Sequence, residues 1–424
     1  MQSPTNTPTA ATIAAAGLVA LAVAMGIGRF AFTPLLPMML SEGSVDLPGA
    51  GLLASANYLG YLLGALGCTF QPWVWRRFGW ATSVQGPRLV RGGLVATALF
   101  TTGMALHFPA AWPLLRFAAG IASAVVFVYT TGFCLEQLAS RAVPAMGALI
   151  YVGPGAGIVA SGLAASALVQ MQATAASGWL TFGMLAALLT ALVWRVFENR
   201  MPTPTPTPTP TPASASASAS ASACAPSAQA PVLPPGGTGE MALLTVAYGL
   251  AGIGYIITAT FLPVIARQAL PGSPLLDVFW PLFGVGVMVG ALLASRMPAG
   301  VDLRLRLAAC YVLQAMGVAA SLVSPTLGGF AIGSLLLGLP FTAITFFAMQ
   351  EVRRLRPTDA TSFMGLLTAA YGLGQIIGPP LAVWLVARTS SAAAGFGLSL
   401  WLATGLLLVG AALYVLIARR HRLR

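Results

Sequence analysis

The chain has 424 residues, of which 57% are hydrophobic and 7% charged, and its mean hydropathy is +0.85. Soluble globular proteins carry about 25% charged residues, so the composition argues against soluble enzymes, nucleic-acid-binding proteins and disulfide scaffolds. It predicts a polytopic membrane protein. The net charge of +12 depends on 21 arginines, since the sequence has no lysine. Four cysteines in apolar or low-complexity sequence predict neither a disulfide framework nor a metal site, and we expect no cofactor.

Twelve apolar stretches follow one another along the chain, and most reach the ~20 residues that a helix needs to cross the hydrocarbon core. Backbone polar groups have no water partner there, so we expect helices. The first six stretches cover 11–39, 49–70, 90–106, 112–135, 143–169 and 178–197. The last six cover 241–265, 276–295, 305–323, 327–349, 361–387 and 394–417. The sequence therefore predicts an all-α membrane protein with twelve transmembrane helices.

A low-complexity segment separates the two sets of helices. It runs through alternating Thr-Pro, then alternating Ala-Ser, then a stretch that contains Pro and Gly. Pro at every second position favours extended polyproline II, and the Ala-Ser run has no large apolar side chain to bury. We therefore expect an N-terminal six-helix half (1–197), a disordered linker (198–240) and a C-terminal six-helix half (241–424).

The distribution of arginine predicts the orientation in the membrane. If the amino terminus is cytoplasmic, 17 arginines lie in inner loops, helix ends and the tail, while Arg267 and Arg388 lie in outer loops. This bias places both termini and the linker in the cytoplasm, and we expect a bacterial inner membrane protein. No basic segment precedes the long first stretch, so we expect no cleaved signal peptide. Because the positive charge serves topology, no nucleic-acid partner is expected.

The two halves repeat each other at fixed offsets. GIGRFAFTPLLP (26–37) lies over GIGYIITATFLP (252–263) at an offset of 226 residues, with five identities in twelve positions. The same offset of 226 matches Gly60 with Gly286 and Gly64 with Gly290, and an offset of 218 matches Gly120 with Gly338. Two repeated six-helix halves are typical of secondary transporters, which alternate access by rocking one half against the other. The sequence thus predicts pseudo-symmetric halves.

Two motifs carry a family resemblance. GIGRFAFTPLLPMM (26–39) and ASANYLGYLLGAL (54–66) resemble the YbfB/YjiJ branch of the major facilitator superfamily, and the twelve-helix pattern resembles the superfamily as a whole. The resemblance implies the major facilitator fold, with a central cavity lined largely by helices 1, 4, 7 and 10. It also implies a seam between the halves formed by helices 2, 5, 8 and 11, in which the paired glycines of these helices would lie. The loop after helix 2 departs from the superfamily, because it lacks the acidic residue of the Gly-Asp-Arg signature.

Two arginines fall within the predicted helices. A charge near the bilayer centre costs about 2.5–3.5 kcal/mol on insertion scales, so we expect Arg29 to face a wet cavity and bind substrate; the alternative is a buried structural pair. Arg116 is close to Trp112 at the outer end of helix 4, where it can also snorkel to the interface. Arg116-xxx-Gly120 resembles a superfamily motif linked to proton coupling, and 153–157 resembles the Gly-Pro motif of exporters.

No carboxylate falls in the middle of a predicted helix. Glu136 and Glu351 lie at inner helix ends, and the other seven acids lie in loops, the linker or span edges. If transport is coupled to protons, coupling would use Glu136 with Arg116 or the protonation of the substrate itself. The alternative for Glu136 is a helix-end ion pair with Arg141 or a neighbouring loop arginine. Within the spans, the polar or amphipathic groups that we expect to line the cavity are Asn57, Tyr58, Tyr61, Tyr129, Tyr255, Tyr371 and Gln375.

These features predict a secondary active transporter, not an enzyme, that moves a small organic solute by alternating access. Two arginines and no acid within the spans favour an organic anion. The Gly-Pro motif supports the alternative of an exporter of amphiphilic, drug-like compounds. From other classes, a channel and a membrane-embedded enzyme remain, although no catalytic constellation is visible. The expected partners are the solute, membrane lipid and, if transport is coupled, protons.

Overall fold

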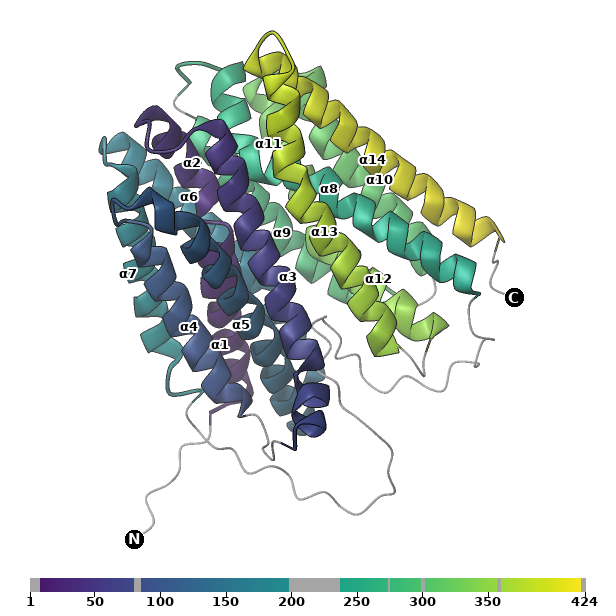
Figure 1. Cartoon of the computed structure of the whole chain (residues 1–424). Coiled ribbons are helices and arrows are strands. Elements are labelled where there is room, and N and C mark those ends of the chain that lie inside the picture. Colours follow the sequence, from purple (N-terminus) through teal and green to yellow (C-terminus); the bar gives the residue numbers. More distant parts are fainter. Residues whose placement is uncertain are drawn as a thin grey trace, which may run out of the picture.

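The computed structural model describes residues 8–79, 85–197, 237–273, 275–298, 302–356 and 360–420. The predicted linker from 198 to 236 lies outside these residues. The described ranges consist of helices joined by short turns and loops, and no strand occurs in them. The helices form two groups that stand side by side and diverge toward the side that carries the chain termini (Figure 1). We call this side the termini side.

Most helices coincide with the stretches predicted from the sequence. The N-terminal half contains α1 (Ala10–Leu21), the π-helix η1 (Ala22–Arg29), α2 (Phe32–Ser41), α3 (Leu47–Arg77), α4 (Gly86–Gly103), η2 (Pro109–Ala111), α5 (Trp112–Ser140), η3 (Pro144–Val152), α6 (Gly153–Gln170) and α7 (Ala175–Val193). The C-terminal half contains α8 (Thr238–Ala269), η4 (Leu276–Val278), α9 (Phe279–Arg296), α10 (Leu303–Val323), α11 (Leu327–Gly338), α12 (Phe341–Leu355), α13 (Ala360–Ala387) and α14 (Ala392–Arg420).

Eleven helical stretches in the described residues are long and apolar enough to cross a membrane. Five of them combine shorter pieces: α1, η1 and α2 form the first, α11 and α12 form another, and the remaining three join η2 to α5, η3 to α6 and η4 to α9. The third predicted span corresponds to α4, an 18-residue helix packed between α5 and α7. The all-α, multi-pass architecture predicted from the sequence is confirmed. One boundary shifts, because α8 begins at Thr238 and Glu240 is therefore helical rather than part of the linker.

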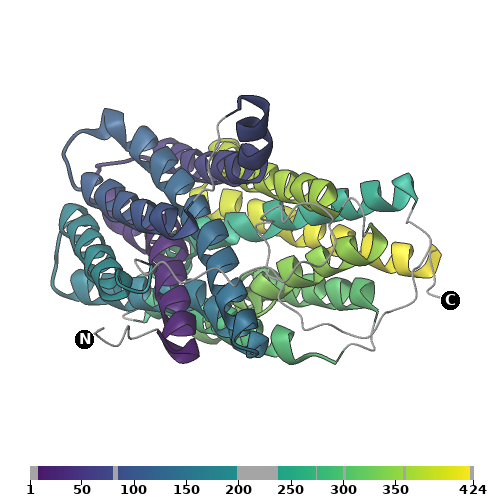
Figure 2. The same cartoon turned by 90° about the horizontal axis from the view of Figure 1, so that it is seen from below.

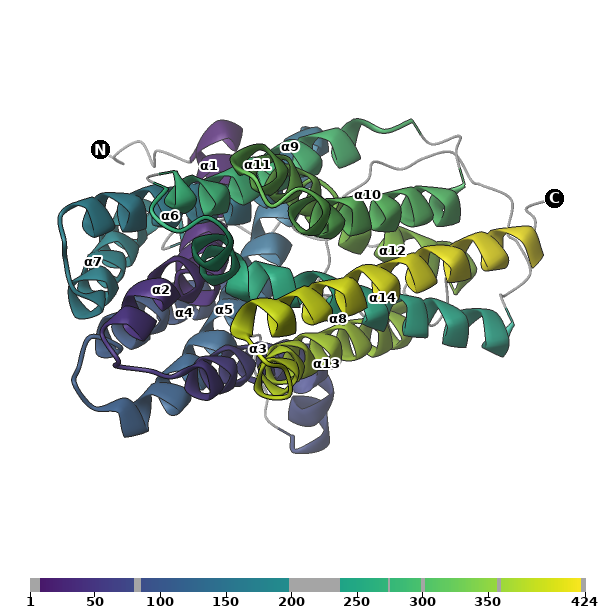
Figure 3. The same ribbon diagram turned by 90° about the horizontal axis from the view of Figure 1, so that it is seen from above.

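The halves meet through the helices that the resemblance assigned to the seam. α3 packs along α13 and α6 packs along α9, and near the middle α2 contacts α8 (Figures 2 and 3). Gly155 and Gly162 of α6 permit the close approach to α9, since a Cβ atom at either position would lie within 3 Å of α9 atoms. At the other contact Gly372 of α13 faces Leu62 of α3.

The paired glycines do not lie in this seam, and that expectation is wrong. A Cβ atom at Gly60 of α3 would lie 2.0 Å from the carbonyl oxygen of Phe117 in α5, within the same half. A Cβ atom at Gly290 of α9 would lie 1.8 Å from the carbonyl oxygen of Leu339, again within one half. The other two pairs also face helices of their own halves: Gly153 and Gly157 of α6 face α1 and η1, and Gly374 and Gly378 of α13 face α8. Small residues spaced four apart predict that another helix packs closely against that face, but they do not predict which helix it is.

The same contacts confirm the internal repeat. Gly120 lies against the carbonyl group of Asn57, and Gly338 lies against that of Phe283. Gly338 matches Gly120 at the offset of 218 residues, and Phe283 matches Asn57 at the offset of 226 residues. Each half is therefore built on the same helix-to-helix approach and is held together internally by backbone contact.

We predict that Gly60→Ala destabilises the protein whereas Gly67→Ala, in the same helix, does not. The Cβ atom at position 60 meets backbone that cannot move aside, while nothing lies within 4 Å of the Cβ position at Gly67. Alanine also favours a helix by about 1 kcal/mol over glycine, so the control variant should be as stable as wild type. Thermal unfolding in detergent measures both. Equal unfolding temperatures for the two variants would contradict the packing described.

Candidate functional site

A cavity of about 660 Å³ lies between the two halves. It is lined by η1, α3, α5, η3 and α6 from the N-terminal half and by α8, α9, α12 and α13 from the C-terminal half. Its lining reaches Leu135, Met146, Arg296 and Met349, which lie toward the termini-side ends of their helices. The cavity therefore extends to the termini side. The resemblance implied a wall made largely by the first, fourth, seventh and tenth spans, which correspond to η1, α5, α8 and α12. These helices share the wall with the second, fifth, eighth and eleventh spans, which correspond to α3, η3 with α6, α9 and α13.

Arg29 lies at the inner end of this cavity. Its side chain is 4% exposed, and its Nη2 atom donates a hydrogen bond of 2.5 Å to Oε1 of Gln375 in the other half. The guanidinium carbon is 4.1 Å from the ring centroid of Tyr61 and 5.3 Å from that of Tyr58, at the range of cation–π attraction. The Nε atom is buried without a hydrogen-bond partner. Among the described residues that line the cavity, none is acidic.

A break in helix 1 presents this side chain. The π-helix η1 ends at Arg29, and α2 begins at Phe32. In a continuous α-helix the carbonyl groups of Gly28 and Arg29 would accept from the N–H groups four residues later. Thr33 N instead donates to Phe30 O, and the guanidinium of Arg116 takes the freed carbonyl groups, with distances of 3.1 Å to Gly28 O and 2.9 Å to Arg29 O.

Arg116 does not snorkel to the interface, and that alternative is wrong. Its side chain is 2% exposed and points from α5 toward helix 1. The rings of Phe32 and Trp179 lie 5.3 and 5.9 Å from its guanidinium carbon. Asn57 donates to the carbonyl group of Arg116 at 2.8 Å, so one predicted site residue fixes the backbone of another. Arg116 is a positioning residue for Arg29, because it binds the Arg29 carbonyl group directly.

Gln375 is held from the opposite direction. Its Nε2 atom donates to the hydroxyl group of Tyr255, which leaves Oε1 to accept from Arg29. Tyr255 stacks on Tyr371 with ring centroids 5.7 Å apart, and Tyr371 stacks on Tyr248 at 4.8 Å. Offset stacking at these distances is favourable. Tyr255 is the repeat partner of Arg29, so the two equivalent positions meet at one amide group.

The structure separates the predicted site residues into three groups. Arg29, Tyr61, Tyr371 and Gln375 line the cavity. Directly behind this lining, Asn57, Arg116 and Tyr255 bond to its members or to the neighbouring backbone, and Tyr58 bonds the hydroxyl group of Thr260. Two residues lie elsewhere: Tyr129 donates to Gln71 at 3.0 Å, and Glu136 is exposed near the end of α5 and does not line the cavity. Arg141 donates to Gln137.

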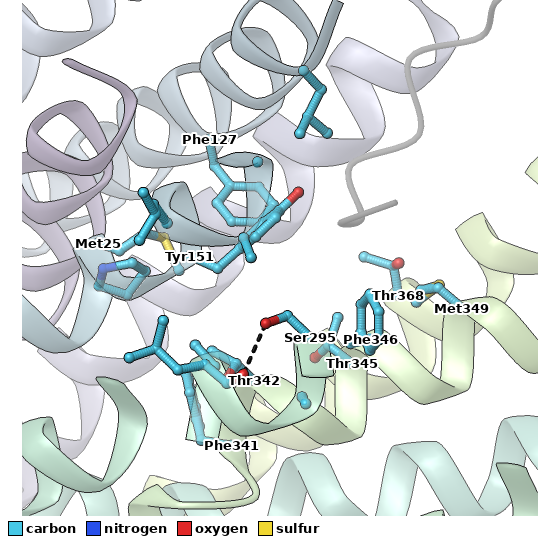
Figure 4. A pocket seen from close by; sticks show the side chains of 18 of the residues that line it. Met25, Phe127, Tyr151, Ser295, Phe341, Thr342, Thr345, Phe346, Met349 and Thr368 are labelled. Carbon is cyan, nitrogen blue, oxygen red and sulfur yellow. Dashed lines mark hydrogen bonds between the residues drawn. The ribbon is translucent and has the colours of Figure 1, made fainter. Parts of the chain in front are cut away.

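Sequence reasoning missed the aromatic walls. Phe127 and Tyr151 of the N-terminal half face Phe341 and Phe346 of the C-terminal half across the cavity (Figure 4). On the C-terminal side, the hydroxyl-bearing side chains of Thr342, Thr345 and Thr368 lie beside Phe341 and Phe346. Aromatic residues occur on most faces of these apolar helices, so their sequence positions alone do not single out the ones that face the cavity.

The side opposite the termini is closed by hydrogen bonds between the halves. The hydroxyl group of Thr33 donates to Ala259 O at 3.1 Å, and Thr33 and Ala259 are repeat partners at the offset of 226 residues. Tyr58 bonds Thr260 at 3.0 Å, and Ser55 donates to Ile376 O at 2.8 Å. These bonds lie around the Arg29–Gln375 contact and, together with it, seal the inner end of the cavity.

A buried ion cluster, also missed, ties the C-terminal half together. Arg304 of α10 lies 2.6 Å from Glu351 of α12 and 3.0 Å from Glu240 of α8, and all three are at most 4% exposed. It also donates to the carbonyl group of Ile417 in α14. The cluster does not line the cavity. Because Arg304 joins four helices at their termini-side ends, we assign it to the rigidity of this half.

The divided helical architecture and the central cavity between repeated halves define a transporter of the major facilitator superfamily (MFS). The chain belongs to the family described as the uncharacterised MFS-type transporter YbfB, whose model matches residues 21–415. It is therefore a multi-pass membrane protein of a transporter family, and such families are generally not enzymes. No curated protein matches the chain.

Solved structures share the fold. The human organic anion transporter MFSD10 (TETRAN) is similar with a TM-score of 0.59 and 17% identity, over 96% of this chain and 100% of that one. A point mutant of the nucleoside transporter NupG is similar with a TM-score of 0.66 and 13% identity, over 96% of this chain and 99% of that one. At such low identity the likeness supports the fold alone.

We predict that Arg116→Leu lowers the unfolding temperature by several degrees. The substitution leaves two buried carbonyl groups without a donor, and each unsatisfied group costs about 1–3 kcal/mol. Arg116→Lys should be intermediate, because an ammonium group lacks the planar fork that reaches both oxygens. The exposed Arg388 provides the control, and Arg388→Leu should unfold at the wild-type temperature. If Arg116→Leu does so as well, Arg116 does not support the break in helix 1.

Proposed function

We propose that the chain is a secondary active transporter that binds a small organic anion at Arg29 and moves it by alternating access. The observation that carries the proposal is a buried guanidinium at the inner end of a cavity whose described lining contains no acidic residue. A buried charge without an opposite charge is unstable in a membrane protein. A bound carboxylate supplies that charge and can accept two parallel hydrogen bonds from one guanidinium.

The neutral partner of Arg29 supports a binding step in which the anion takes the place of Gln375 on the guanidinium. Gln375 offers a neutral amide oxygen where a carboxylate would be the stronger acceptor. An incoming anion therefore replaces Gln375 on the guanidinium. This exchange breaks a bond between the halves and weakens the sealed side, where the Tyr58–Thr260 and Ser55–Ile376 bonds lie nearby. The binding energy of the anion is thereby linked to the rocking of the halves.

The orientation completes the proposal. Most arginines lie in termini-side loops and helix ends, so the termini and the linker at 198–236 face the cytoplasm of a bacterial cell. The described conformation is then open to the cytoplasm and closed to the outside. Glu136, exposed and outside the cavity lining, has no contact with the anion site, so proton coupling would depend on the protonation of the solute.

We predict that Arg29→Gln abolishes binding and transport of organic anions while the protein still folds. The neutral amide preserves a polar group beside Gln375 but removes the charge that the anion needs. Arg29→Lys keeps the charge without the fork, so it should bind at least tenfold more weakly than wild type, in line with the ~1.4 kcal/mol of one weakened charged hydrogen bond.

The measurement is a thermal-shift screen of purified protein against organic acids, followed by uptake into proteoliposomes. Arg388→Gln is the control for loss of surface charge. The proposal is overturned if Arg29→Gln is folded and responds to the same acids as wild type. Flux that never saturates and shows no counterflow would instead indicate a channel.

A further inference from the structure

The polar groups of the cavity are concentrated at its inner end. Beyond Arg29 and Gln375 the described lining offers Arg296 near the termini side and otherwise only hydroxyl groups, with no acid, lysine or histidine. The hydroxyl group of Thr345 accepts from Tyr248, and that of Ser295 donates to the carbonyl group of Leu292. A solute with an ammonium group would lose its water without gaining an acidic partner. One anionic group is all that this inner end recognises.

The walls beyond that end are aromatic and built by both halves. Phe127 and Tyr151 face Phe341 and Phe346 across the cavity, and all four side chains are partly exposed within the protein (Figure 4). Phe341 is fixed by edge contacts with other aromatic rings at 5.2–6.1 Å, so its face does not have to be ordered on binding. Preorganised aromatic faces favour a flat ring between them.

We infer that the transported solute is an aromatic monocarboxylate. This inference rests on the proposed function, because it places the carboxylate on Arg29 and the aryl body between the two walls. The lining disfavours two other classes: dicarboxylates find one cation at the inner end, and amino acids find no acid for their ammonium group.

The test measures binding of a matched set of compounds to the full chain in lipid nanodiscs by calorimetry. Phenylbutyrate and cyclohexylbutyrate share size and charge but differ in aromaticity; phenylbutyramide lacks the charge, and succinate carries two. We expect phenylbutyrate to bind about tenfold more tightly than cyclohexylbutyrate, as aromatic contacts predict. Phenylbutyramide and succinate should bind at least tenfold more weakly than phenylbutyrate.

Variants of the aromatic walls separate the contribution of the solute's ring to binding from that of its carboxylate. Phe127→Leu and Phe346→Leu should each weaken phenylbutyrate binding about fivefold and leave cyclohexylbutyrate binding within about twofold of wild type. Arg29→Gln should abolish binding of both acids. Phe108→Leu is the control, because Phe108 is 62% exposed in the loop before α5. Using two wall variants keeps the test valid if one of them fails to fold.

The outcomes are distinguishable. Equal affinity for the two acids, unchanged by both wall variants, overturns the aromatic inference and leaves the anion site in place. Binding of phenylbutyramide as tight as phenylbutyrate, and unaffected by Arg29→Gln, overturns the proposed function itself. Failure of every aryl carboxylate to bind also overturns the inference. Preference for phenylbutyrate that is lost in the wall variants supports it.

Discussion

The hydrogen bond between Arg29 and Gln375 joins the two halves at the inner end of the cavity, and the rest of the site is arranged around it. A guanidinium is buried there with a neutral amide as its partner and no acidic residue in the described lining. Arg116 holds the backbone on one side of this bond, and Tyr255 holds the amide on the other. In the proposed cycle a carboxylate replaces the amide on Arg29, since it is the stronger acceptor, and the bond between the halves opens.

Such a switch requires halves that move as units. Backbone contacts at Gly60, Gly120, Gly290 and Gly338 fix helices within each half, and the Arg304 cluster adds an ionic anchor to the C-terminal half. Contacts between the halves include single hydrogen bonds, aromatic contacts of Phe30, and the close approach of α6 to α9 and α3 to α13. This division of contacts favours rocking about the seam over bending within a half.

The sequence predicts the helices, the repeat and Arg29, because hydropathy, fixed offsets and a charge within a span are local signals. It does not predict the role of Arg116, since the carbonyl groups that it binds are freed only by the break in helix 1. Glycine spacing gives a tight face but not the helix that it meets, so the assignment of Gly60 to the seam was wrong. Glu240 and Glu351 become a buried pair around Arg304 only when distant helix ends converge.

The most direct test of this account measures distances across both sides of the seam by pulsed electron paramagnetic resonance, in a background without native cysteines. Exposed positions Ser140 and Arg353 report on the termini side, and Ser41 and Ser390 report on the opposite side. In Gln375→Glu a carboxylate strengthens the bond to Arg29, which should increase the population that is open on the termini side and closed opposite. Gln375→Leu should shift both populations the other way. Identical distance distributions in wild type and both variants would show that the Arg29–Gln375 bond does not control access to the cavity.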